Sequence, residues 1–67
     1  MAVMPNVTGL DLKLQRTAAR VTQRELAEQL GVRAQFISQV EARAVVKPAT
    51  AERYVAALAA VANTKAA

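Results

Sequence analysis

Sixty-seven residues, 54% of them hydrophobic, are enough for one domain around one small core, near the lower size limit for folding without a disulfide or a metal. The chain has no cysteine, no histidine and only five acidic residues, which excludes disulfides and thiolate zinc sites and argues against a metal centre or general-base catalysis. Nine basic residues give a net charge of +4, the sign expected for a nucleic-acid partner, although many unrelated small domains are as basic.

A membrane-spanning helix needs about 18 to 20 consecutive apolar residues. No segment of this sequence has them, because polar or charged residues recur every few positions between Asp11 and Arg53. The opening residues MAVMPNVTG contain no basic residue and too short an apolar run for a signal peptide. We therefore expect a soluble cytoplasmic protein that is not an enzyme, with no cofactor, no metal and no small-molecule substrate.

The periodicity of the apolar residues predicts an all-α fold, a compact bundle of four short helices, or five if one more is present. The predicted helices cover residues 9–20, 23–30, 34–42 and 51–62. They form a single domain over residues 1–67. Residues 1–7 and 63–67 are expected to be flexible tails, because nothing in their sequence ties them down.

The first helix is predicted from a start signal and one apolar stripe. Thr8 can cap the helix, and Asp11 at the third helical position completes a pair that resembles a capping box. Leu10 and Leu14 are four residues apart and therefore share a helical face. We accordingly place Leu14 in the core.

The second helix has the clearest boundaries. Thr22 and Glu25 form a capping box, in which the threonine hydroxyl and the glutamate carboxylate each accept a hydrogen bond from the other residue's backbone amide. Gly31 can take the left-handed conformation that closes a helix, and Val32 can then fold back onto the preceding turn. A third helix begins near Arg33.

The apolar residues of the second and third helices match across this turn. Leu26 and Leu30 share one face, Ile37 and Val40 share another, and the small Ala27 lets the helices cross closely. Two helices joined by a tight glycine turn in this pattern form a helix-turn-helix, the motif that sets its second helix in the DNA major groove.

The fourth helix follows Pro48, which disfavours helical structure at Lys47 and can itself start a helix. Tyr54 and Leu58 lie on its apolar face. The predicted core of the whole domain comprises Leu14, Leu26, Ala27, Leu30, Val32, Phe36, Ile37, Val40, Tyr54 and Leu58.

Residues from about 12 to 58 resemble the helix-turn-helix domain shared by lambdoid phage repressors, Cro proteins and bacterial regulators of the xenobiotic-response-element type. The matching features are Arg16, the sequence VTQRELA over residues 21–27, LGV over 30–32, FISQVE over 36–41, and Pro48. The resemblance implies a sequence-specific transcriptional regulator, a repressor of the Cro type that binds a pseudo-palindromic, double-stranded operator. Such a protein would act as a homodimer, at least on DNA, in a bacterial host or as a phage product.

The resemblance also implies roles for individual residues. The side chains that would read base edges from the third helix are Arg33, Ala34, Gln35, Ser38 and Gln39. Those that would contact or attract DNA phosphates are Gln23, Arg43, Lys47, Arg24 and Arg20. For each of them taken singly, the alternative is an ordinary solvated side chain. Arg16 and Glu41 match a pair that the family joins in a structural salt bridge.

Two departures from the family pattern affect the third helix. Arg43 stands where the family usually has glycine, so either Arg43 takes a costly left-handed conformation or the helix runs on through Ala44. Arg33 replaces the usual serine or threonine cap, which removes a capping hydroxyl and adds a charge at the groove.

Other functions also fit these motifs. An antitoxin or a restriction-modification controller that regulates its own operon has the same kind of domain, and an antitoxin would also bind a protein partner. The alternative from a different class is a protein-interaction module, whose contact surface would be marked by Val3, Val7, Val45, Val46, Val55 and Val61.

Overall fold

The structure is a computed structural model that describes residues 7–66. Of the predicted tail at residues 1–7, residues 1–6, which include Val3, lie outside the described residues, as does Ala67. Val7 is described and is bridged to Val46, so it is not a free tail residue. The four helices are α1 (Gly9–Ala18), α2 (Gln23–Leu30), α3 (Ala34–Glu41) and α4 (Pro48–Ala66). No strand occurs among residues 7–66, apart from one isolated antiparallel bridge between Val7 and Val46, so the predicted all-α bundle is confirmed.

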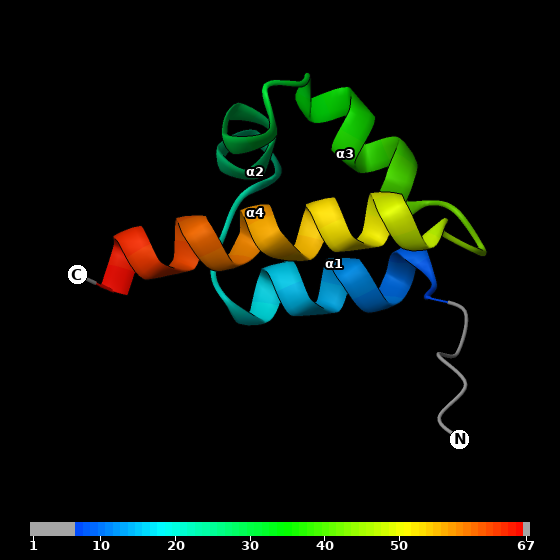
Figure 1. Ribbon diagram of the computed structural model, residues 1–67, viewed down its shortest axis with the longest axis horizontal. Coiled ribbons are helices and arrows are strands. Elements are labelled where there is room, and N and C mark those ends of the chain that lie inside the picture. The colour runs from blue at the N-terminus through cyan, green and yellow to red at the C-terminus, as the bar shows by residue number, and fades with distance from the viewer. Residues whose placement is uncertain (1–6, 67) are drawn as a thin grey trace.

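The long helix α4 organises the molecule. It runs along the length of the domain, with α1 on one side and the α2–α3 pair on the other (Figure 1). α2 packs on both α3 and α4, and α1 packs on both α3 and α4. This arrangement leaves α3 at the surface, packed against α1 and α2.

The predicted helix starts and the glycine turn are present. The Asp11 amide donates to the Thr8 hydroxyl at 3.1 Å, and the Glu25 amide donates to the Thr22 hydroxyl at 3.0 Å, with both capping boxes complete. Gly31 has a φ of 72°, a left-handed conformation that glycine adopts without strain. Local sequence signals therefore determine where α1 and α2 begin and where α2 ends.

α3 ends at Glu41 and does not continue through Ala44, so that alternative is wrong. Arg43 is not left-handed either, since Arg20 is the non-glycine residue with positive φ in the described part of the chain. The reason is a contact from far along the sequence. The Gly9 amide donates to the Arg43 carbonyl at 2.9 Å, and so the first turn of α1 closes the end of α3.

α4 is longer than predicted at both ends, and residues 63–66 of the expected tail are helical. Pro48 starts the helix, as a residue without an amide hydrogen can at the first helical position. At the other end the Thr64 hydroxyl donates to the Ala60 carbonyl at 3.0 Å, and Lys65 contacts the turn between α1 and α2. These contacts extend the helix through a sequence that carries no stop signal. Conversely, α1 ends at Ala18, before the left-handed Arg20.

Most of the predicted core lies inside the molecule, but two of its residues, Leu14 and Phe36, are exposed. Leu14 is 57% exposed, whereas Leu12 is fully buried. Residues two positions apart in an α-helix point about 200° away from each other. Because Leu12 and Arg16 face inward, Leu14 between them faces outward. Phe36 is only half-buried, at 38% exposed, while Leu30 and Val32 pack on the core edge. The buried apolar residues are Leu12, Val21, Leu26, Ala27, Ile37, Val40, Val46, Ala51, Tyr54, Ala57 and Leu58.

Within the described residues, no helix combines the length and the apolar character that crossing a bilayer requires.

Candidate nucleic-acid interface

One face of α3 is free of packing. The helix turns Ile37, Val40 and Glu41 inward, and its opposite face points to solvent (Figure 1). Every side chain predicted to read bases is exposed there: Arg33, Ala34, Gln35, Ser38 and Gln39. A helix that stands on the surface in this way fits a major groove about 12 Å wide, because polar side chains then face the base edges.

The turn before α3 fixes how the helix is presented. The Val32 amide donates to the Ala27 carbonyl at 2.9 Å, across the left-handed Gly31. Arg33 is the N-cap of α3 and makes no side-chain capping bond, as its replacement of serine or threonine implied. Its guanidinium is therefore left available at the N-terminal end of the exposed face.

A buried carboxylate holds α3 to the rest of the domain. Arg16 of α1 binds Glu41 of α3 through two bonds, from Nε to Oε2 at 2.7 Å and from Nη2 to Oε1 at 3.1 Å. Arg16 Nη1 also donates to the Val21 carbonyl at 2.9 Å. The two ion-paired side chains are 9% and 4% exposed, so this is an interior pair, consistent with a structural role.

Tyr54 of α4 completes this network. Its hydroxyl donates to Glu41 Oε2 at 2.5 Å, and the hydroxyl oxygen lies 3.2 Å from the Leu12 carbonyl. Tyr54 was predicted as a core residue on the apolar face of its helix, and this bond was not foreseen. The available signal was the residue type itself, because a buried tyrosine hydroxyl needs a hydrogen-bond partner. One carboxylate thus joins α1, α3 and α4.

The network shifts the pKa values of its members. Burial by itself would raise the pKa of Glu41, but bonds from Arg16, Tyr54 and Gln23 outweigh burial and hold it below its ordinary value. The hydrogen bond with Glu41 raises the pKa of Arg16. Burial and then the Glu41 carboxylate raise the pKa of Tyr54. Near neutral pH the pair is therefore ionised and the phenol keeps its proton.

Gln23, the predicted phosphate ligand, also belongs to this network. It is the first residue of α2, and its Nε2 donates to Glu41 Oε1 at 3.1 Å. One hydrogen of the amide group remains for another acceptor. The backbone amides of Gln23 and Arg24 have no acceptor within residues 7–66, as is usual for the first turn of a helix. An anion at this helix end would meet several N–H donors.

The other predicted phosphate contacts are scattered around α3. Arg43 and Lys47 are exposed in the segment between α3 and α4, and Arg20 is exposed beyond the end of α1. Arg24 is exposed and lies 3.8 Å from Glu28, too far and too solvated for strong pairing. The structure therefore does not gather these four cations into one cluster.

The charges around α2 and α3 are nevertheless unbalanced. The acidic residues of the two helices each have a basic partner: Glu25 with Lys65, Glu28 with Arg24, and Glu41 with Arg16. Within the described chain, no ion pair involves Arg33, Arg43 or Lys47. The α3 side of the domain consequently keeps an excess of positive charge, which attracts a polyanion.

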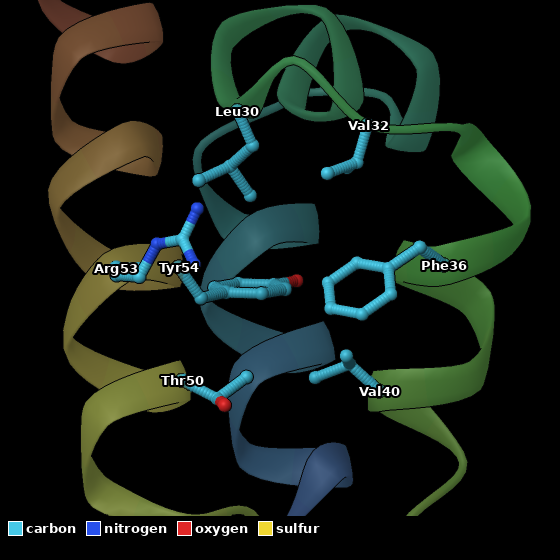
Figure 2. A pocket seen from close by; sticks show the side chains of 7 residues that line it. All are labelled: Leu30, Val32, Phe36, Val40, Thr50, Arg53 and Tyr54. Atoms are coloured by element: carbon cyan, nitrogen blue, oxygen red, sulfur yellow. The ribbon is translucent and has the colours of Figure 1, made fainter.

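A small apolar hollow lies behind α3. It has a volume of about 60 Å³, and Figure 2 shows the Tyr54 ring pointing from α4 toward the ring of Phe36 on α3. Its lining consists of Leu30, Val32, Phe36, Val40, Thr50, Arg53 and Tyr54. Cofactor and ligand pockets are larger, typically about 300 Å³ or more. The hollow is therefore too small for a cofactor, and Phe36, which lines it, remains 38% exposed.

A helix-turn-helix family model matches residues 12–61, most of the described chain. No curated protein and no solved structure matches the sequence significantly. The matched range contains the turn at Gly31, the exposed face of α3 and the Arg16–Glu41 pair. The chain therefore belongs to the helix-turn-helix family of the lambda repressor and Cro type, and it is a DNA-binding transcription regulator.

Proposed function

We propose that two copies of this protein bind one pseudo-palindromic operator, each with α3 in the major groove. The observation that carries this proposal is the exposed, polar and unpacked face of α3, bordered by unpaired cations. A two-fold dimer presents its recognition helices about one DNA turn apart, ~34 to 36 Å. An operator occupied in this way is closed to polymerase, so repression is the expected outcome.

In this proposal the base-reading side chains have distinct chemistry. Gln35 and Gln39 are four residues apart and point the same way, and a glutamine amide can bond the N6 and N7 edge of adenine. Arg33 can bond the O6 and N7 edge of guanine, and Ala34 can pack on a thymine methyl group. Ser38 lies between them and can bond either kind of edge.

Phosphate binding would hold α3 in register. The amide hydrogen that Gln23 does not use for Glu41, together with the free amides of the first turn of α2, suits a phosphate. Arg43 and Lys47 would contact the backbone from the segment after α3, and Arg20 and Arg24 would add to the attractive field.

The protein-interaction alternative has weaker support. Val46 is 2% exposed, so its assignment to a contact surface was wrong, and Val7 is paired with it. Val61 packs against the core as well. Val45 and Val55 are exposed, at 56% and 41%, but two separate valines do not make a docking surface.

Selection of bound sequences from a random duplex library, at near-physiological salt, tests the proposal. The wild type should enrich a two-fold symmetric motif, and a Gln35→Ala/Gln39→Ala variant should change that motif. A Gln15→Ala/Gln29→Ala variant is the matched control, because it removes two exposed glutamines outside α3. No enrichment by the wild type, or the same motif from the α3 variant, would refute the assignment of α3 as the reading helix.

A further inference from the structure

The end of α4 is fastened to the turn between α1 and α2. Lys65 Nζ lies 2.7 Å from Glu25 Oε1 and donates to the Arg20 carbonyl at 2.6 Å. In Figure 1 this part of α4 extends past the turn that leads into α2. Lys65 lies beyond residues 12–61, the range that the family model matches.

The partner of Lys65 already has a task in α2. Glu25 Oε1 accepts the Thr22 amide at 2.9 Å and so closes the capping box that starts the helix. The same oxygen therefore receives the capping amide and the ammonium group. The hydrogen bond from Lys65, followed by the bond from Thr22, lowers the pKa of Glu25.

A carboxylate at this place has two opposite effects. It stabilises the free helix, because negative charge is favourable near the N-terminus. It also repels any phosphate that approaches the same helix turn, where Gln23 and the free amides lie. Like charges brought together at an interface reduce both affinity and association rate. A capped α2 that binds DNA therefore benefits from a cation beside Glu25.

We propose that Lys65 is a positioning residue for DNA binding, which neutralises Glu25 so that the first turn of α2 can keep its capping carboxylate and still accept a DNA phosphate. This role rests on the proposed function, in which that turn contacts the DNA backbone. Lys65 acts through Glu25 and is not itself a phosphate ligand. Its second bond, to the carbonyl of the left-handed Arg20, fixes the ammonium group at the turn.

A double-mutant cycle distinguishes this role from direct phosphate contact. The substitutions are Lys65→Gln and Glu25→Gln, singly and together, and glutamine at the third helical position preserves a capping box. Lys13→Gln is the matched control, because Lys13 is exposed on α1 and has no ion pair within the described residues. Affinity for the selected operator is measured by fluorescence anisotropy.

Lys65→Gln should weaken binding about two- to fivefold per monomer, the range of solvent-exposed charge effects, and more than Lys13→Gln does. In the Glu25→Gln background the same change should have little effect, because the carboxylate that Lys65 neutralises is then absent. An equal loss in both backgrounds would identify Lys65 as a direct contact and overturn the proposal. A loss no greater than that of Lys13→Gln would overturn it as well.

A measurement without DNA tests the contact itself. Carboxyl resonances followed by NMR through a pH titration should show the pKa of Glu25 rising toward its ordinary value in Lys65→Gln and staying low in Lys13→Gln. An unchanged Glu25 titration would refute the Lys65–Glu25 pair even if the protein binds DNA. Absence of DNA binding by the wild type, with the Glu25 shift present, would instead refute the proposed function and with it the role of Lys65.

Discussion

Gly9→Ala should destabilise the domain strongly, because α1 meets the end of α3 at this residue without room for a methyl group. A Cβ atom on Gly9 would lie 2.4 Å from the Glu41 carbonyl oxygen and 2.5 Å from the Val40 carbonyl oxygen. Both neighbours are backbone atoms and cannot turn aside as a side chain would. The two helices would have to separate, which would also stretch the 2.9 Å bond from the Gly9 amide to the Arg43 carbonyl.

The size of this effect follows from three contributions. Overpacking of a tight contact typically costs about 1 to 3 kcal/mol. Weakening of the Gly9 hydrogen bond adds about 1 kcal/mol. The usual gain on replacing glycine by alanine in a helix offsets about 0.5 to 1 kcal/mol. The expected net loss is therefore about 1 to 3.5 kcal/mol, a large share of the ~3 to 10 kcal/mol that a domain of this size has.

Thermal unfolding followed by circular dichroism provides the assay. A loss of that size should lower Tm by roughly 4 to 28 °C in a domain this small. Gly31→Ala is the comparison, since a Cβ there meets no atom within 4 Å and would be strained only by the positive φ. Its cost should be about 1 kcal/mol, and Gly31→Asn should cost less, because asparagine tolerates the left-handed conformation. A Gly9→Ala protein as stable as the wild type would refute the close approach of α1 to α3.

Three further predictions concern the buried network and the DNA backbone. The folded-state pKa of Glu41 is lowered, so the stability that this carboxylate gives the domain is complete above the unfolded-state pKa of about 4.3 and is lost as the pH falls through the folded-state pKa. Between pH 6 and 3, the urea midpoint of unfolding should therefore fall less steeply for Glu41→Gln than for the wild type. Equal slopes in the two proteins would contradict this prediction. Tyr54→Phe should cost about 1.5 to 3 kcal/mol in urea unfolding, because it removes a hydrogen bond to a charged group, and a change below ~0.5 kcal/mol would mean that the hydroxyl does not serve Glu41. Lys47→Ala should reduce the slope of log affinity against log salt by about one unit without altering the selected motif, whereas an unchanged slope would remove Lys47 from the phosphate contacts.

The sequence predicted α2, its glycine turn and the start of α3 closely, because the determining signals are local. The capping box at Thr22 and Glu25, and the left-handed residue Gly31, act within a few positions of the structure they produce. The exposed face of α3 followed in the same way from helical periodicity. Its assignment to base reading came from the resemblance to a family and not from the spacing of these residues.

The errors arose where distant residues decide the outcome. Leu10 and Leu14 form one stripe on α1, and Leu12 and Arg16 form another. The second stripe faces the core because Arg16 pairs with Glu41, which lies 25 positions further along the chain. The end of α3 depends in the same way on Gly9. The extension of α4 depends on Lys65, and the bond from Gln23 to Glu41 spans 18 positions. No window of local sequence contains these partners.

The bond from Gln23 to Glu41 has a consequence for how such a regulator can change its target. The side chains on the outer face of α3 are exposed, so substitutions there should alter base preference with little effect on folding. Gln23 is different, because its amide serves both the interior carboxylate and the proposed phosphate. A variant library would therefore tolerate many residues on the reading face and few at position 23. Substitutions on α3 can thus change the preferred operator sequence while the proposed contacts to the DNA phosphates stay the same.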